Sequence, residues 1–147
     1  LSVDVDARAV RRAWDAASRG RVIGVAGDGS AEAALITDEV RRLVGPRDRV
    51  VVDLPLTETV VQGAADQGAD VVVLVSATPI APLTRGVSRQ IRVVAVGFGA
   101  GACAPSTALS AAAKAHGGRC HEVVAANGAT ASPAAVLDDI ASAAWGG

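Results

Sequence analysis

The sequence predicts an α/β fold, a three-layer sandwich in which helices cover both faces of a five-stranded parallel β-sheet. Three observations lead to this prediction. Short apolar segments alternate with helix-like segments along the 147 residues. The middle three apolar segments are continuously apolar instead of alternating with polar residues, which is typical of parallel strands covered on both faces. Repeated strand–helix units of this length imply right-handed crossover connections within one sheet.

Five segments are predicted as strands, and their two ends differ in composition. Four segments begin with Arg and the third begins with Asp, whereas their exit ends run into Gly, Pro, Ser, Thr and Asn. Five parallel strands favour the flavodoxin-like order 2-1-3-4-5, and a minimal Rossmann-like order, 3-2-1-4-5, is the alternative. The predicted strands cover residues 21–27, 49–55, 70–77, 92–98 and 119–125.

The segments before and between these strands carry helix signals. An extra N-terminal helix over about 6–19 precedes the first strand. Ser30 is predicted to cap the helix after the first strand, and Thr57 the helix after the second, because hydroxyl side chains accept from the first N–H groups of a helix. A weaker and shorter helix is predicted over 81–90, where Gly86 interrupts it.

The last two helices are predicted from proline, serine and glycine positions. Pro105 starts the helix after the fourth strand, and a glycine pair ends it. Ser132 caps the final helix, and Pro133 takes its first position. The inward face of that helix is predicted to consist of Val136, Ile140 and Ala144.

Composition limits the classes of function. The length suits one α/β domain over residues 1–147. A net charge of -1 and 2% aromatic residues give neither the field nor the stacking surface that nucleic-acid binding needs. The apolar runs are too short to span a membrane, and no signal peptide is visible, so a cytoplasmic location without membrane contact is expected. Cys103 and Cys120 are expected to be two ordinary thiols, not a disulfide or a metal site.

The carboxyl ends of the strands are predicted to form the binding site, because ligands of open parallel sheets bind where the strand order reverses. The loops predicted there are small and polar, in contrast to the Val-rich strands that precede them. No metal site is predicted. The candidate binding residues are Gly27, Asp28, Gly29, Ser30, Asp53, Ser76, Thr78, Gly97, Gly99 and Gly101.

The loop at 27–30 has two interpretations. Backbone N–H groups at a helix N-terminus bind anions, and the glycines would let a ligand approach them. However, the glycine spacing departs from G-x-G-x-x-G, no Walker lysine follows, and Asp28 would repel a phosphate. The other interpretation is a tight strand-to-helix turn that Ser30 caps.

The run "VVVDLP" around Asp53, followed by "GADVVVLVSATP", resembles the second half of MinD/ParA-type ATPases. The resemblance implies that Asp53 serves a magnesium site. The phosphate-binding lysine loop of that family is absent, and the lone lysine, Lys114, lies late in a predicted helix. A pseudo-ATPase is therefore what this resemblance implies. The residues alone suggest that Asp53 caps the turn after the second strand.

The arrangement of the loops also resembles the cobalamin-binding domain of B12-dependent mutases and methyltransferases, over roughly residues 21–101. In that family an Asp-x-His-x-x-Gly loop follows the first strand, and its histidine replaces the cofactor's lower ligand. Here Asp28 matches the aspartate, whereas Ser30 stands in place of the histidine and Ala33 in place of the glycine.

Further matches to the cobalamin-binding family lie at the third and fourth strands. Ser76 matches the serine of the family's Ser-x-Leu element, with Thr78 in place of the leucine, and Gly97 and Gly99 lie where a Gly-Gly pair would contact the corrin tail. Serine does not ligate cobalt as imidazole does. The resemblance therefore implies either a cofactor-free structural subunit or a variant that binds another ligand.

The sequence predicts no catalytic set. His121 and Glu122 are neighbours in a strand, so they should point to opposite faces of the sheet. His116 lies near a helix C-terminus, where the helix dipole favours a cation. Cys103 follows a glycine-rich loop, and its thiol is either activated by a helix N-terminus or inert and buried.

Two classes of function therefore stay open. The first is a non-catalytic domain that binds a small molecule or assembles with a protein partner or a second copy, using the strand-exit loops or the apolar, weakly charged second half of the chain. The second is an enzyme or enzyme subunit that binds a nucleotide-like or phosphorylated ligand at the same loops. Cobalamin and a nucleotide are the cofactor candidates.

Overall fold

The chain folds as a five-stranded parallel sheet with the strand order β2-β1-β3-β4-β5. A computed structural model describes residues 20–83, 91–123 and 134–145. The order confirms the predicted flavodoxin-like topology, and the Rossmann-like alternative is wrong. The strands are β1 (Val22–Gly27), β2 (Arg49–Pro55), β3 (Val71–Ser76), β4 (Arg92–Phe98) and β5 (Cys120–Val123).

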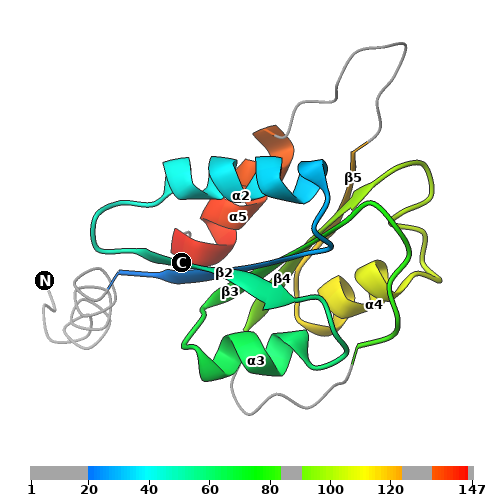
Figure 1. The fold of residues 1–147 in the computed structure, drawn as a ribbon, viewed down its shortest axis with the longest axis horizontal. Coiled ribbons are helices and arrows are strands. Elements are labelled where there is room, and N and C mark those ends of the chain that lie inside the picture. The colour runs from blue at the N-terminus through cyan, green and yellow to red at the C-terminus, as the bar shows by residue number, and fades with distance from the viewer. Residues whose placement is uncertain (1–19, 84–90, 124–133, 146–147) are drawn as a thin grey trace, which may run out of the picture.

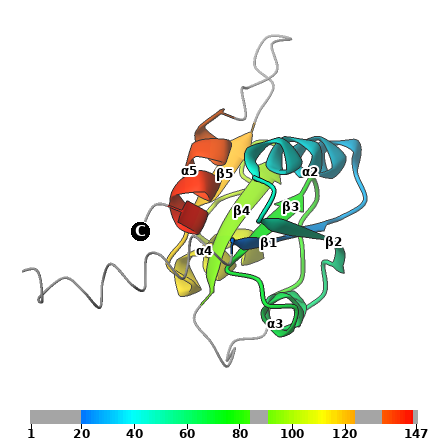
Figure 2. The same ribbon diagram turned by 90° about the vertical axis from the view of Figure 1, so that its left-hand side faces the viewer.

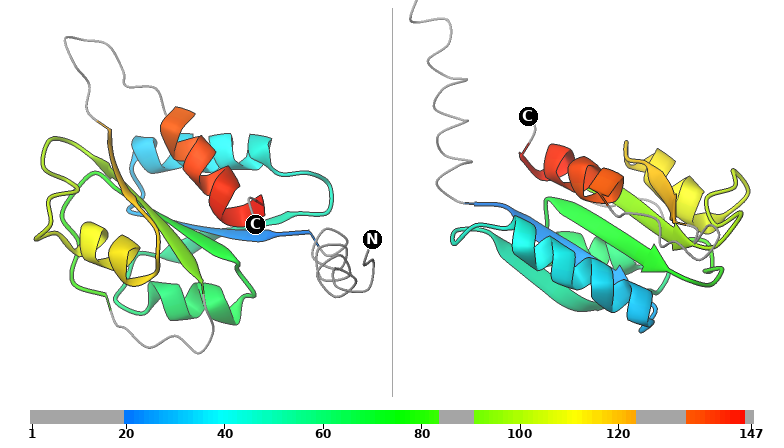
Figure 3. Two further views of the ribbon diagram at one scale, coloured as in Figure 1. Left: turned by 180° about the vertical axis from the view of Figure 1, so that it is seen from behind. Right: turned by 90° about the horizontal axis from the view of Figure 1, so that it is seen from above.

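Helices cover both faces of the sheet, as Figures 1 and 2 show. One face carries α2 (Ala31–Leu43) and α5 (Ala134–Trp145), which lie side by side (Figure 3). The other face carries α3 (Val60–Asp66) and α4 (Ala108–Ala115). None of the helices in the described part of the chain combines the length and the apolar character needed to cross a membrane.

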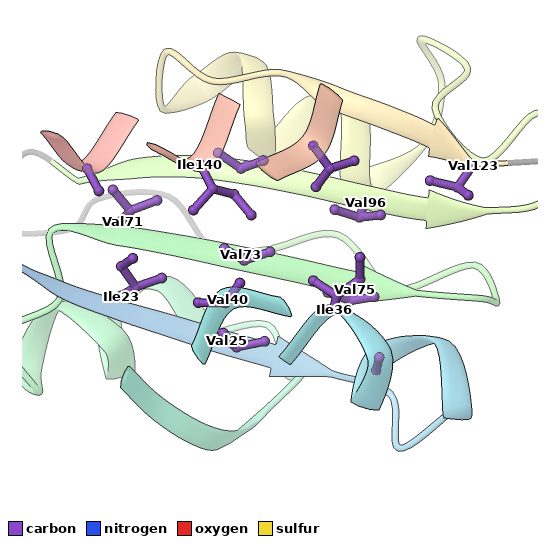
Figure 4. Packing of buried hydrophobic residues seen from close by; sticks show 14 residues of the cluster. Ile23, Val25, Ile36, Val40, Val71, Val73, Val75, Val96, Val123 and Ile140 are labelled. Atoms are coloured by element: carbon purple, nitrogen blue, oxygen red, sulfur yellow. The ribbon is translucent and has the colours of Figure 1, made fainter. Parts of the chain in front are cut away.

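The central strand β3 shows why the sequence specifies two covered faces. All six of its residues are buried. Val71, Val73 and Val75 pack under α2 and α5, whereas Val72 and Leu74 pack against α3 and α4. Because successive strand residues point to opposite faces, a continuous run of valines fills two cores at once. Figure 4 shows the core on the α2–α5 side, where Ile36 and Val40 of α2 and Ile140 of α5 meet the valines.

One predicted helix cap and one predicted helix face are confirmed. Ser30 is the N-cap of α2, and its Oγ accepts a hydrogen bond from the Ala33 N–H at 3.2 Å. The face of α5 that was predicted to point inward is buried, with Val136, Ile140 and Ala144 all 5% exposed or less. Both results follow from local rules, namely hydroxyl capping and helical periodicity.

The predicted start of the helix after β2 is wrong. Helix α3 begins at Val60, and its N-cap is Thr59, whose side chain makes no capping hydrogen bond. Thr57 instead accepts a backbone hydrogen bond from the Val60 N–H at 3.1 Å through its carbonyl. A turn over 57–60 therefore takes the place of the predicted first helical residues.

The predicted start of the helix after β4 is also wrong. Pro105 lies in a turn that the Thr107 N–H closes by donating to the Ala104 carbonyl at 2.9 Å. Helix α4 begins at Ala108, and Thr107 caps it by accepting from the Ser110 N–H at 3.2 Å. A threonine that accepts this bond is a stronger helix start than a proline two residues earlier.

Several predicted segments lie wholly or partly outside the described residues. These are the helix over 6–19, the cap at Ser132 with Pro133, and the last two residues of the strand predicted over 119–125. Of the helix predicted over 81–90, residues 81–83 are not helical, and the remainder lies outside.

Candidate ligand-binding pocket

The strand order reverses between β1 and β3, and Asp28 joins the loops that follow these two strands. Its Oδ2 accepts from the Ala77 N–H at 2.9 Å, and its Oδ1 accepts from the Ser30 N–H at 3.0 Å. The Ser76 hydroxyl lies 3.4 Å from Oδ2 and also donates to the Thr78 carbonyl. The carboxylate predicted to face a ligand therefore holds two loops together.

The hydrogen bonds to Asp28 set its ionisation. Burial raises the pKa of its carboxyl, but the hydrogen bonds from Ser30 and Ala77 outweigh burial and hold the pKa below its usual value. Asp28 is thus a carboxylate at neutral pH, and a phosphate placed beside it would meet a negative charge.

The glycines beside Asp28 serve the turn. A Cβ added at Gly27 would lie 2.7 Å from the Cβ of Ala33, so glycine lets α2 start against the end of β1. Gly29 has a φ of +82°, a conformation that favours glycine. Together with the Ser30 cap, these contacts match the interpretation of 27–30 as a tight strand-to-helix turn.

A pocket of about 690 Å³ opens next to this turn, on the α3–α4 side of the sheet. Its walls come from the segment after β3, the segment after β4, and α4, with Val61 contributed by α3. The segment after β3 supplies Ala77, Pro79, Ile80, Pro82 and Leu83. The segment after β4 and the helix α4 supply Ala100, Ala102, Leu109, Ala111, Ala112 and Ala115, with Phe98 at the end of β4.

The described residues of the pocket wall are mainly apolar. None of its described residues is Asp, Glu, Lys or Arg, and its polar members are Ser76, Thr78, Ser106, Thr107 and His116. Two of these hydroxyls already have intramolecular partners, because Ser76 donates to the Thr78 carbonyl and Thr107 donates to the Ala104 carbonyl at 2.7 Å. A pocket of this size with mainly apolar walls and a few polar groups is typical of small-molecule sites.

His116 is the titratable side chain among the described residues of this wall, at the C-cap of α4. Its position at the helix C-terminus led to the expectation of a favoured cation. Burial instead lowers the pKa of the His116 imidazole. The ring is therefore neutral at pH 7 and presents one donor and one acceptor nitrogen.

The structure divides the predicted binding residues. Ser76, Thr78 and Gly101 line the pocket. Gly97 and Gly99 border it without lining it, and the loop at 27–30 lies beside it. Asp53 is in β2, on the far side of β1 from β3. The predicted set thus covers part of one rim, whereas the apolar walls and His116 were missed.

Cys103 and Cys120, expected as separate thiols, form a disulfide with a Cα–Cα distance of 5.7 Å. The bond joins the segment after β4 to the start of β5. Cys120 lies beside Ala95 of β4 and faces the α4 side, where the returning segment passes over it. The expectation of free thiols is therefore wrong. The two cysteines are 17 residues apart in the sequence, and this spacing does not indicate that the segment after β4 folds back onto β5.

Searches for related proteins gave no match among the family models, the curated proteins or the solved structures.

The two neighbours in β5 point to opposite faces, as predicted. His121 Nε2 lies 2.7 Å from Asp139 Oδ2 of α5, whereas Glu122 Oε1 accepts from the Cys103 N–H at 3.3 Å on the α4 side. Across the stretches 20–83, 91–123 and 134–145, no three His, Cys, Asp or Glu side chains come together to hold a metal ion.

Proposed function

We propose that this chain is a non-catalytic binding domain that holds an uncharged, mainly apolar small molecule in the pocket between β3, β4 and α4. The observation that carries the proposal is the wall itself: about 690 Å³ of space with no charged side chain among its described residues. Buried apolar contact supplies the affinity, and the neutral His116 and the rim hydroxyls orient the ligand.

A binding role agrees with the hydrogen bonds that the polar side chains at and beside the pocket make within the protein. Ser76 is 1% exposed, and its hydroxyl donates to the Thr78 carbonyl. Asp28 accepts two backbone hydrogen bonds. A serine nucleophile is commonly activated by a base that a third group orients, and His116 stands in the described wall without a carboxylate beside it in that wall. These contacts support binding over catalysis.

The loop at 27–30, beside the pocket, limits what the cobalamin resemblance can contribute to this proposal. The position that carries the cobalt-ligating histidine in that family is Ser30, whose Oγ accepts from the Ala33 N–H. That serine caps α2 and does not offer an imidazole. These residues do not fit the histidine-on binding mode, so cobalamin enters only as one member of a ligand panel.

The decisive experiment combines Nile red, a neutral apolar fluorophore, with a pair of matched tryptophan substitutions. Ala111 is exposed on α4 and lines the pocket, whereas Ala34 is exposed on α2, on the other side of the sheet. Ala111→Trp should fill the pocket and weaken Nile red binding by about tenfold or more, since about 1.4 kcal/mol corresponds to each factor of ten. Ala34→Trp should leave the affinity unchanged.

The results separate the proposal from its alternatives. Equal binding by both variants, or no binding by the unmodified chain, would overturn the proposal. A thermal-shift panel with nucleotides, flavin and cobalamins detects the ligands that the alternative function would use, because a ligand that binds only the folded state raises the melting temperature. Oligomers detected by light scattering, together with a melting temperature that no ligand raises, would favour the assembly role with a protein partner or a second copy.

We keep the cytoplasmic location as part of the proposal, although the disulfide sets a condition on it. Protein disulfides persist in oxidising compartments, and those found in the cytosol are usually transient and redox-sensing. Thiol trapping in lysate of the producing cell, before any exposure to air, measures which state Cys103 and Cys120 adopt.

A further inference from the structure

One wall of the pocket is a segment that has little regular structure of its own. This wall segment, residues 99–107, connects β4 to α4 and contributes Ala100, Gly101, Ala102, Ser106 and Thr107 to the lining. Gly99 and Gly101 have φ values of +120° and +80°, and the segment is a series of turns. Its internal hydrogen bonds are short-range, such as Ala102 N–H to the Gly99 carbonyl at 3.3 Å.

Three connections hold the wall segment against β5. The Gly99 N–H donates to the Val123 carbonyl at 3.0 Å, and the Cys103 N–H donates to Glu122 Oε1 at 3.3 Å. The third connection is the Cys103–Cys120 disulfide. Glu122 is exposed, so its hydrogen bond competes with water, and a single net hydrogen bond contributes little. Of these three connections, the covalent bond is therefore the strongest restraint on the middle of the segment.

We propose that the Cys103–Cys120 disulfide is a redox switch that sets the shape of the pocket, a role that rests on the proposed binding function. In the oxidised state the wall segment lies on β5 and completes the pocket. In the reduced state the middle of the segment is released, the glycines let it move, and the ligand loses one wall.

The switching step is an ordinary thiol–disulfide exchange with a dithiol reductant. One thiolate of the reductant attacks a sulfur of the protein disulfide, which forms a mixed disulfide and releases the other cysteine as a thiolate. The second thiol of the reductant then displaces the remaining protein sulfur. The protein gains two electrons and two protons as Cys103 and Cys120 thiols, and the reductant becomes a cyclic disulfide.

The alternative is a disulfide that only stabilises the fold. A structural bond of this kind changes the free energy of unfolding for the whole domain and leaves the pocket of the folded molecules as it is. The two roles differ in which parts of the protein open more easily after reduction of the disulfide. The switch affects the wall segment and α4 in the folded state, whereas the structural bond affects all elements equally through global unfolding.

Amide hydrogen exchange of the whole chain, with and without dithiothreitol, tests the switch without any ligand. We expect peptides over 99–107 to exchange about tenfold faster after reduction, with β1 and α2 unchanged, because local opening is independent of global unfolding. The amides of the Cys103→Ser/Cys120→Ser chain should exchange at the rates of the reduced protein, and dithiothreitol should not change those rates. Unchanged exchange over 99–107, or faster exchange spread over every element, would overturn the switch.

Nile red affinity in the two states then links the switch to the pocket. We expect reduction to weaken binding by about fivefold or more, the lower end of typical coupling between two sites. Equal affinity in both states would overturn the switch and leave the binding function standing. Faster exchange over 99–107 in a chain that binds no Nile red in either state would overturn the binding function, and with it the redox control of a ligand.

Discussion

Substituting Gly97 by alanine probes the packing that shapes the pocket. Gly97 is buried at the end of β4, between Ser76 of β3 and Glu122 of β5. A Cβ at this position would lie 2.5 Å from the Cβ of Ala102 and 3.3 Å from Cδ1 of Leu109. Carbon atoms pack at about 3.5–4.0 Å, so the wall segment must move outward by about 1 Å to admit the methyl group.

The size of the effect follows from this overlap. Forcing one carbon into a packed core typically costs about 1–3 kcal/mol. Most of that cost here comes from one contact, because Ala102 contributes the nearest atom and Leu109 can rotate its terminal methyl. Gly97→Ala combined with Ala102→Gly removes the nearest atom. We therefore expect a coupling energy of about 1–2 kcal/mol in the direction that restores stability.

Urea unfolding of the four chains of this double-mutant cycle, followed by circular dichroism under oxidising conditions, measures the coupling. A lower transition midpoint with an unchanged slope reports a loss of stability in the folded state. A cost below about 0.5 kcal/mol for Gly97→Ala, which is ordinary for a harmless substitution, would refute the packing argument. Strict additivity of the two substitutions would refute it as well, because the clash between the two methyl groups would then be absent.

Three further predictions address other parts of the fold. Gly63 lies inside α3 with open space where a Cβ would go, so Gly63→Ala should raise stability by about 1 kcal/mol in urea unfolding. Ile140 is fully buried between α5 and the sheet, so Ile140→Ala should cost about 2–5 kcal/mol in the same assay, and a smaller loss would mean that α5 is loosely packed. Burial raises the pKa of the Asp28 and Asp48 carboxyls, but hydrogen bonds outweigh burial and lower both pKa values. For Asp48, the donors include the backbone N–H groups of Gly45 and Arg21. A lowered folded pKa means that the unfolded chain binds the proton more tightly, so this stabilisation is present above the ordinary aspartate pKa and is lost as pH falls through the folded value. Asp28→Asn and Asp48→Asn should each flatten the acid side of a plot of melting temperature against pH, and an unchanged acid side would contradict the hydrogen-bond assignment.

The sheet could be predicted from the sequence because its signal is local and redundant. Strands β2, β3 and β4 are short valine-rich runs that follow a charged residue or begin with one, and β3 fills two cores with alternate residues of one apolar run. Parallel pairing with right-handed crossovers then allows few arrangements. The helix starts at Val60 and Ala108 were missed because nearby residues, Thr57 and Pro105, also fit a helix start. The choice between such neighbours depends on turn hydrogen bonds that a sequence pattern does not encode.

The candidate site could be predicted only at its polar edge. Ser76, Thr78 and Gly101 stood out because polar and flexible residues at strand ends are a known signature of binding loops. The apolar residues of the pocket carry no such mark. Leu109 packs in the core and also lines the pocket. Ile80 follows β3, and Leu83 lies in the stretch 81–90, which has the composition of a weak helix. An apolar side chain at a cavity wall has the same sequence signal as one in a filled core.

The disulfide shows what kind of information was missing. Alternation along β5 placed His121 and Glu122 on opposite faces, and the same alternation puts Cys120 on the face of Glu122. It does not say which segment returns to that face. The return is made by residues 99–107, whose turns at Gly99 and Gly101 direct Cys103 back toward β5 before α4 begins. The pocket lies between this segment, α4 and the loop after β3. The disulfide and one wall of the pocket therefore belong to the same segment, so we expect reduction of the disulfide to change the pocket.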